Sequence, residues 1–294
     1  MRCAQLTVLC LAGTAGLEAQ RPRLGVAPDK AEPGAIVRLT LGGIATRDSV
    51  RAIRGAMAGE PLHFVRADSG RWRAIGAVPV DAAMSVSARV LVTLASGKVD
   101  TLLARVAVPP FVPPKTEPLT VDTGFTRLDS ARVARVERDN AKAREIGRRS
   151  HGTPRLWFVS FLKPRASVQT STFGTGRSFN GTVTSRHLGV DFRGKVGDTV
   201  FASNRGVVAL TEDFLLAGTV LYLDHGAGVV TGYFHLSKVL VAAGDTVTRG
   251  QAVALVGESG RVTGSHLHWS ARYGSLTVNP LDLVALDRRW YAAP

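Results

Sequence analysis

Two histidines, His266 and His268, stand two residues apart between apolar neighbours in the stretch 264–269, Gly-Ser-His-Leu-His-Trp. This alternation of polar and apolar residues is typical of a β-strand, in which positions i and i+2 lie on one face. Both imidazoles are then expected to point the same way. A lone His-x-His pair is more often a surface feature than a site, so a metal site requires further ligands.

A second pair of candidate ligands, His187 and Asp191, stands four residues apart in the stretch His-Leu-Gly-Val-Asp. Four is an even spacing, so in an extended segment these two side chains also share a face. Two imidazole nitrogens and one carboxylate oxygen are a ligand set that suits zinc. The two pairs together therefore predict a zinc site.

The segments around these pairs resemble those of the lysostaphin/LytM-type zinc metallopeptidases, the M23 peptidase family. The resemblance spans residues 168–286 and rests on three segments in the family's order, which are SRHLGVD (185–191), GYFHL (232–236) and GESGRVTGSHLHW (257–269). It implies that one catalytic Zn²⁺ ion is bound by His187, Asp191 and His268.

The resemblance also gives catalytic roles to the two remaining motif histidines, His235 and His266, which flank the metal in the family. Histidine titrates near neutrality, so either residue is able to exchange a proton or to stabilise an oxyanion, and which of them is the base stays open. Some family members carry a tyrosine shortly before the first metal-binding histidine as a further oxyanion donor. Residues 179–181 are Phe-Asn-Gly here, which leaves Asn180 and Arg186 as candidate replacements.

By resemblance, the expected function is a zinc-dependent endopeptidase that hydrolyses amide bonds in the stem or cross-link peptides of peptidoglycan. The alternative is a catalytically inactive envelope scaffold that activates other cell-wall hydrolases. Inactive members typically lose metal ligands, and the complete ligand set of this chain therefore favours the enzyme.

An internal repeat suggests a third, non-enzymatic interpretation. Gly-Asp-Thr-Val occurs at residues 197–200 and again at 244–247, each time followed by a glycine-containing apolar strand, as in lipoyl and biotinyl carrier domains. A carrier needs an exposed lysine at its hairpin tip, and no lysine follows Lys238. We therefore interpret the repeat as scaffolding of a sheet.

The N-terminal segment is typical of a secretory signal peptide, with an early arginine, an apolar run and then small residues. Cleavage is expected near Ala15 or Ala19, and the absence of a small residue before Cys10 disfavours a lipid anchor. Cys3 and Cys10 are the two cysteines of the chain and precede both sites, so the mature protein is expected to have no disulfide. No later run is apolar enough to span a bilayer. The signal peptide therefore predicts export to the periplasm, cell envelope or extracellular space.

The formal net charge is +14 at pH 7, and arginine dominates it. Such a charge favours anionic partners, for which acidic cell-envelope polymers are the candidates beside peptidoglycan peptides, although a compositional bias toward arginine explains the same excess. The arginines are scattered and lack the interleaved aromatic residues that stack on bases, so nucleic acid is not an expected partner. The oligomeric state is not predicted by the sequence.

The predicted fold is mainly β. Short alternating segments predict a β-sandwich of immunoglobulin type, with hairpin turns at residues 68–70 and 95–97. The later strands predict an antiparallel-β domain of lysostaphin type. The predicted segments are a signal peptide (1–19), the β-sandwich (24–108), a linker and helix (109–160) and the peptidase domain (161–290). Within the sandwich, strands are expected at 35–41, 62–65, 72–76, 87–94 and 101–108.

A proline-rich segment, residues 109–115, is typical of a stiff linker. The helix that follows is predicted to start at Ser130 as its cap and to end at Gly147. It either packs on the edge of the domain or lies across the catalytic groove as a gate. The other three histidines, His63, His151 and His225, are expected to have no part in the site.

Overall fold

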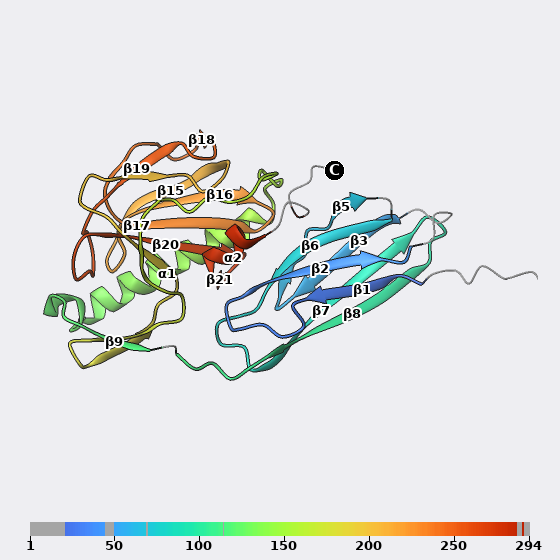
Figure 1. Cartoon of the computed structure of the whole chain (residues 1–294), viewed down its shortest axis with the longest axis horizontal. Coiled ribbons are helices and arrows are strands. Elements are labelled where there is room, and N and C mark those ends of the chain that lie inside the picture. Colours follow the sequence, from blue (N-terminus) through green and yellow to red (C-terminus); the bar gives the residue numbers. More distant parts are fainter. Residues whose placement is uncertain (1–20, 45–49, 69, 114, 287–289, 291–294) are drawn as a thin grey trace, which may run out of the picture.

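The computed structural model describes residues 21–44, 50–68, 70–113, 115–286 and 290. The predicted signal peptide and both cysteines lie outside these residues. Figure 1 shows two β-rich parts side by side, with the linker running along one edge into strand β9 (Thr116–Leu119) and then helix α1 (Ser130–Ser150). In the described part of the chain, neither helix has both the length and the apolar composition needed to cross a membrane.

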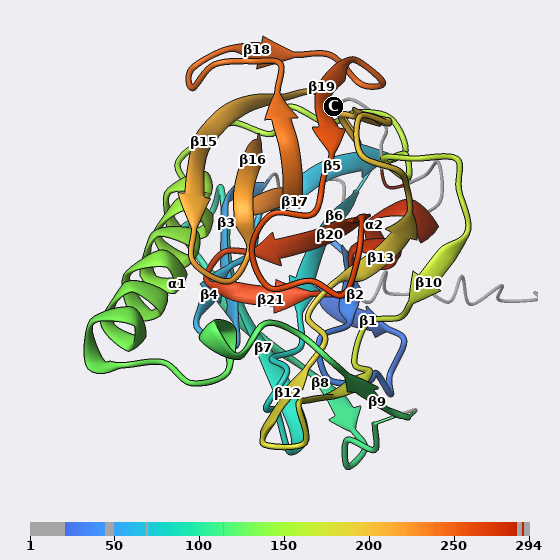
Figure 2. The ribbon, with the colours of Figure 1, turned by 90° about the vertical axis from the view of Figure 1, so that its left-hand side faces the viewer.

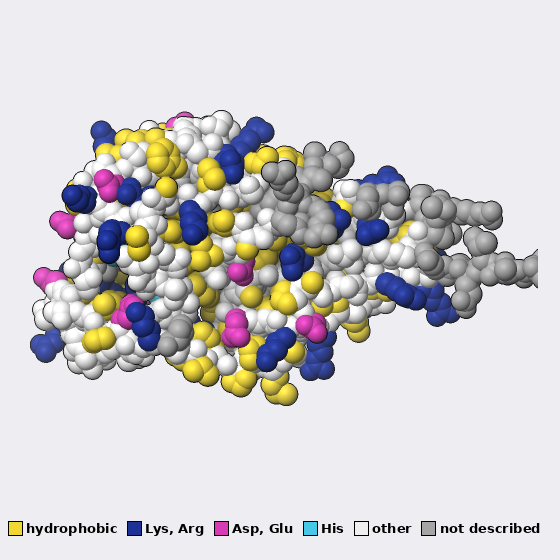
Figure 3. Space-filling view, in the orientation of Figure 1, with side chains coloured by type: hydrophobic (Ala, Val, Ile, Leu, Met, Phe, Trp, Pro, Cys, Tyr) yellow, Lys and Arg dark blue, Asp and Glu magenta, His cyan; other side chains and the backbone are white. Residues whose placement is uncertain are grey.

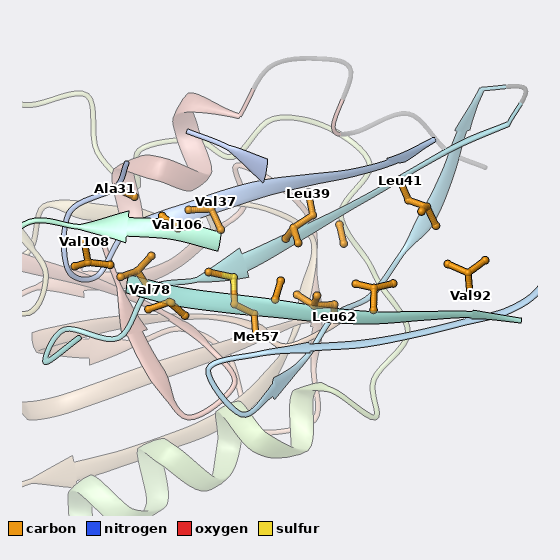
Figure 4. Packing of buried hydrophobic residues seen from close by; sticks show 14 of the residues in the cluster. Ala31, Val37, Leu39, Leu41, Met57, Leu62, Val78, Val92, Val106 and Val108 are labelled. Carbon is orange, nitrogen blue, oxygen red and sulfur yellow. The ribbon is translucent and has the colours of Figure 1, made fainter. Parts of the chain in front are cut away.

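Two four-stranded antiparallel sheets form the N-terminal part, with strand orders β1-β2-β6-β5 and β4-β3-β7-β8. Strand alternation buries Leu39 and Leu41 of one sheet against Val90 and Val92 of the other, and Figure 4 shows side chains of both sheets meeting in this core. The expected mainly-β fold is thus confirmed here, and an immunoglobulin-like topology stays a prediction. The strands are β1 (Arg23–Ala27), β2 (Ile36–Gly42), β3 (Val50–Met57), β4 (Glu60–Pro61), β5 (Val65–Asp68), β6 (Arg71–Ala77), β7 (Met84–Leu94) and β8 (Val99–Val108).

One predicted strand of the sandwich, residues 62–65, is wrong. The chain leaves β4 after Pro61 and enters β5 only at Val65. Leu62 lies between these strands and is buried in the core. Phe64 of the same stretch packs half-buried against this core, so the apolar residues that suggested a strand belong to an inward-packed connection.

Helix α1 differs from its prediction at both ends. Its cap is Asp129, whose side chain accepts a hydrogen bond from the backbone N–H of Arg132 at 2.8 Å, rather than Ser130. Gly147 does not end the helix. It lies inside the last turns, where a Cβ atom would be 1.8 Å from the carbonyl oxygen of Gly274, so close packing explains this glycine.

The C-terminal part contains a ten-stranded sheet, and a small three-stranded sheet of β12, β11 and β9 lies beside it. Strand β9 pairs in parallel with β11, so a segment of the linker is built into the C-terminal part. The remaining elements are a short 3₁₀ helix η1 (Thr123–Phe125), strands β10 (Gln169–Ser171), β11 (Gly176–Phe179), β12 (Val183–Arg186), β13 (Val190–Arg193), β14 (Thr199–Phe201), β15 (Gly206–Phe214), β16 (Gly218–Gly226), β17 (Val229–Val239), β18 (Thr246–Val247), β19 (Ala252–Val256), β20 (His266–Tyr273) and β21 (Leu276–Val278), and helix α2 (Pro280–Ala285).

The central strands of the large sheet have an apolar face and a face that carries polar residues. Phe192, Leu267 and Trp269 point into a core that β14, β18 and β19 close from the other side. Asp191 and His268 alternate with these residues and therefore project from the opposite face. This alternation places Asp191 and His268 on the same face of the sheet.

Helix α1 covers another part of the same polar face. It packs Ala143 and Ile146 against Val220 and Tyr222, over strands β15 to β17, as Figure 2 shows. None of the described residues of α1 lines the cavity beside the motif histidines. The helix therefore packs on the domain and does not gate the groove, and the linker segment that does border the groove is β9.

The repeated Gly-Asp-Thr-Val segments have the same local structure. Gly197 and Gly244 both have φ of +92°, a conformation that favours glycine. The aspartates that follow, Asp198 and Asp245, each accept a backbone N–H bond at 2.8 Å from three residues upstream. Each turn then starts a strand of the core, so the structure agrees with a scaffolding role.

The two domains meet through a buried polar network. Glu60 of the sandwich accepts hydrogen bonds from Nε2 of His151 at 2.8 Å and from the backbone N–H of Ser275 at 2.9 Å. His151 also bonds to His63 at 2.8 Å, and the hydroxyl of Tyr273 donates to the carbonyl of Pro61 at 2.6 Å. His63 and His151 thus have definite structural partners that the sequence did not indicate. An apolar cluster completes this interface with Ile36, Ile75 and Ala77 on one side and Trp157, Phe161, Val229, Ala271, Tyr273, Val278, Leu283 and Leu286 on the other.

Candidate metal centre

Three predicted ligands converge on one point. Nε2 of His187 lies 3.0 Å from Oδ1 of Asp191 and 2.9 Å from Nδ1 of His268, and the latter nitrogen lies 2.9 Å from the same carboxylate oxygen. All three side chains are buried. They form a group that could hold a metal ion.

The register of two strands brings Asp191 and His268 together. β13 and β20 run antiparallel and pair these two residues directly. His187 arrives differently, because it lies in the connection between β12 and β13 and not in one extended segment with Asp191. The shared-face argument for this pair was therefore wrong, although the two residues do meet. The chain bends at Gly189, where a Cβ atom would be 2.5 Å from Nε2 of His268, so the approach requires glycine.

Neighbouring groups fix the orientation of both imidazoles. Nδ1–H of His187 donates to the carbonyl of Thr172 at 2.9 Å, which leaves the lone pair of Nε2 directed at the centre. The ring of Phe234 lies parallel to that of His268, with centroids 5.1 Å apart and an angle of 9° between the planes. The ligands are thus held in place by contacts outside the centre.

The protonation states suit a cation. Burial acts to raise the pKa of Asp191, but the adjacent imidazoles of His187 and His268 outweigh it and hold that pKa well below its usual range. Burial lowers the pKa of His268 to about 4. At neutral pH the centre therefore presents an ionised carboxylate and a neutral imidazole, as metal binding requires. Two imidazole nitrogens and one carboxylate oxygen at this spacing fit a divalent ion such as zinc.

The two histidines with predicted catalytic roles lie beside this centre. Nε2 of His266 is 3.8 Å from Oδ1 of Asp191, and the ring centroids of His235 and His266 are 5.0 Å apart. Each Nδ1–H donates to a backbone carbonyl at 2.8 Å, that of Ser259 for His235 and that of Gly264 for His266. Nε2 is then the proton-accepting nitrogen of each neutral ring.

The backbone of His235 is strained. Its φ is +60°, an uncommon value for a residue with a Cβ atom, and it lies where the pairing of β17 with β16 shifts register. Burial, together with the nearby His266 and His268, lowers the pKa of His235 well below its ordinary value. Strain of this kind persists where the surrounding structure enforces it, and it is concentrated at functional sites.

The two candidate replacements for the family tyrosine are engaged elsewhere. The side chain of Asn180 bonds to both the N–H and the carbonyl of Val121, and Arg186 donates to the carbonyl of Val80. Neither is placed as an oxyanion donor. The cation that contacts the centre is instead Arg177, which donates to Oδ2 of Asp191.

Sequence reasoning missed Arg177 because it belongs to β11, which contributes no motif. A cavity of about 360 Å³ lies beside the centre, and it is lined by further residues that belong to no motif. Its walls come from β9, β10, β11, β13, the start of β20 and the segment that leads into it. It is lined by Glu117, Leu119, Thr170, Ser171, Arg177, Phe179, Asp191, Arg193, Arg261, Val262, Thr263, Gly264, Ser265 and His266.

Residues 185–280 match the model of Peptidase family M23, so the chain contains an M23 peptidase domain. A Pseudomonas aeruginosa protein whose crystal structure is assigned to peptidase M23 has a similar fold, with a TM-score of 0.65 and 25% identity over 87% of this chain and 95% of that one. This similarity spans both domains, and the expected fold class is confirmed.

Two curated relatives are peptidoglycan DD-endopeptidases of Vibrio cholerae. ShyA is 42% identical over 95 residues, which are 32% of this chain and 22% of ShyA. ShyB is 41% identical over 101 residues, which are 34% of this chain and 23% of ShyB. The match thus spans less than a quarter of either relative.

Proposed function

We propose that the protein is a zinc-dependent endopeptidase that hydrolyses amide bonds in the stem or cross-link peptides of peptidoglycan. The observation that carries this proposal is the convergence of His187, Asp191 and His268 at 2.9–3.0 Å with two further histidines beside them. Relatives named peptidoglycan DD-endopeptidases support the substrate class.

His187, Asp191 and His268 would hold the ion, and when bound there zinc supplies Lewis-acid polarisation of the amide carbonyl and of the attacking water. Nε2 of His235 or of His266 then accepts a proton from the attacking water. After the proton is taken up, the same imidazolium is able to stabilise the developing oxyanion or to return the proton to the leaving amine.

An inactive envelope scaffold is the alternative function. A scaffold has no need for three converging ligands, and it has no need for a strained histidine backbone. Keeping His235 at φ +60° costs about 1–3 kcal/mol in typical proteins, so its retention favours catalysis.

Acidic polymers of the cell envelope are a further proposed partner, and the envelope or periplasm is the proposed location. Figure 3 shows Lys and Arg side chains spread over the face in view, rather than gathered in one patch. A diffuse positive charge attracts anionic surfaces without specific recognition.

Digestion of purified peptidoglycan tests the proposal. The mature protein is incubated with peptidoglycans of several cross-link chemistries, and the released fragments are identified by mass. We expect amide cleavage by the wild type, none by Asp191→Ala, and unchanged cleavage by the exposed control Asp213→Ala. Metal analysis should find about one zinc per chain in the wild type and in the control. A zinc-loaded wild type that releases no fragment from any peptidoglycan would support the scaffold instead.

A further inference from the structure

Three arginines line the cavity beside the metal centre, and Arg193 is the one that the strand geometry places most clearly. It follows Asp191 by two residues in β13, so it lies on the same face, and it pairs in register with His266. Two residues of an extended strand span about 7 Å. The backbone of Arg193 is thus about 7 Å from that of Asp191, so its long side chain can reach a group one or two peptide residues from the ligand carboxylate. Its side chain is exposed, and it forms no ion pair with any carboxylate of the described chain.

Arg261 approaches from another wall of the same cavity. Its guanidinium lies over the ring of Phe179, 3.9 Å from the centroid, which holds this flexible side chain in place. Burial lowers its pKa, and the charge of Arg177 lowers it further. Among the residues that the structure describes, no carboxylate pairs with Arg261. A half-buried cation of this kind gains more from an anionic partner than a fully hydrated one.

The two carboxylates of the cavity do not neutralise these arginines. Glu117 is paired with Lys115 at 2.8 Å. Asp191 accepts from Arg177 and lies 2.9–3.0 Å from imidazole nitrogens of the centre. Arg193 and Arg261 therefore keep their full charge, and a divalent ion in the centre would add to it.

We propose that Arg193 and Arg261 bind a free carboxylate that the substrate carries within two residues of the scissile amide. The inference rests on the proposed function and narrows its substrate class. Cross-link peptides in which a residue near the cleaved bond keeps a free carboxylate are the preferred substrates, and bridges made only of uncharged residues such as glycine are poor ones. The planar fork of a guanidinium matches a carboxylate in two parallel hydrogen bonds, which gives this contact its selectivity.

Two synthetic cross-linked peptides test the proposal, identical except that the carboxylate near the scissile amide is free in one and a carboxamide in the other. For the wild type we expect kcat/KM to be about 10-fold to 100-fold higher on the free carboxylate, the usual effect of hydrogen bonds to a charged group. Arg193→Gln and Arg261→Gln should lose most of that preference by slowing only the carboxylate peptide. Arg105→Gln removes the same charge from an exposed position of β8 and should keep the preference.

Equilibrium binding separates this inference from the proposed function. Calorimetry with the two cleavage products, one with the free carboxylate and one with the carboxamide, measures the carboxylate preference without hydrolysis. A preference in binding that both arginine variants lose, in a protein that cleaves neither peptide, would sustain the carboxylate site and overturn the peptidase. Equal binding of both products by the wild type would overturn the carboxylate site. Variants that weaken both products equally would overturn it as well.

Discussion

Phe234 lies parallel to the imidazole of His268 at a centroid distance of 5.1 Å, and the two residues are directly paired across β17 and β20. The aromatic ring therefore restricts the rotation of a proposed metal ligand. Phe234 also contacts Tyr222 of the cluster beneath α1, which fixes its own position. The ligand is thus connected to the packing of the whole domain.

Replacing Phe234 by leucine is expected to weaken zinc binding about 10-fold, the lower end of what loss of an orienting neighbour costs a metal site. Competition with a chelator of known affinity measures the change. Phe214→Leu is the matched control, because Phe214 is buried in the same cluster but does not touch a ligand. If both variants bind zinc equally, the ring of Phe234 does not orient His268.

Variants of His235 and His266 test whether these two residues act in catalysis without binding the metal. His235→Asn tolerates the positive φ of this position, and His266→Ala needs no such precaution. Both are expected to keep zinc and to slow amide cleavage by about 10² to 10⁴-fold, the usual size of a general acid–base or oxyanion contribution. The measurements are zinc content and fragment release on the same samples. Loss of zinc in His266→Ala would instead make this residue a ligand, and wild-type rates in both variants would remove the catalytic role.

The sequence predicted the parts of the centre that depend on strand alternation. His266, His268 and Asp191 lie in β13 and β20, where the period of two alone decides which face a side chain occupies. Arg193 is two residues from Asp191 in the same strand, so strand alternation also predicts its position on this face. His187 was identified through its motif, while its position depends on a bend at Gly189 that no periodicity reveals.

Other contacts were beyond sequence reasoning because they join segments that are far apart in the chain. Glu117 reaches the cavity only because β9 pairs in parallel with β11, which places it opposite Arg177. Gly147 looked like the end of a helix, and only the approach of Gly274 from β20–β21 explains it. In each case the deciding partner lies more than fifty residues away.

His225 is expected to make the protein less stable in acid. It is fully buried, with Nδ1–H donating to the carbonyl of Arg205 and Nε2 bonded to the hydroxyl of Thr231 at 2.8 Å. Burial lowers its pKa to about 4, whereas an unfolded histidine titrates near 6.5. Between these two pH values the unfolded chain binds more protons than the folded one. The contribution of neutral His225 to the unfolding free energy is therefore complete above about pH 6.5 and is lost as the pH falls toward 4. The loss amounts to about 3 kcal/mol of unfolding free energy.

Urea denaturation at pH 7 and pH 4.5 measures this effect in the wild type and in His225→Gln, with zinc removed from both. The variant is expected to be less stable at pH 7 but to lose less stability on acidification, because it has no imidazole to protonate. Equal losses in the two proteins would show that His225 does not carry the pH dependence.

Glu60 is expected to hold the sandwich against the peptidase domain. Its carboxylate accepts hydrogen bonds from His151 and from the backbone of Ser275, and only 6% of the residue is exposed. Nε2–H of His151 donates to Glu60, and Nδ1 of the same ring bonds to Nε2 of His63, so a chain of hydrogen bonds links the two domains. The hydroxyl of Ser275 also donates to this carboxylate, so removing it leaves three donors without their partner.

Glu60→Ala is therefore expected to lower the unfolding free energy by about 1–3 kcal/mol, the usual cost of unsatisfied buried donors. Glu60→Gln keeps one acceptor oxygen and should lose less, and the exposed Asp81→Ala should be neutral. Proteolysis of the linker at residues 109–115 gives a second measurement that responds to the domain contact itself. We expect faster linker cleavage in Glu60→Ala than in the wild type or in Asp81→Ala. An unchanged cleavage rate together with unchanged stability would mean that the apolar cluster around Ile36 and Tyr273 holds the domains together without the polar network.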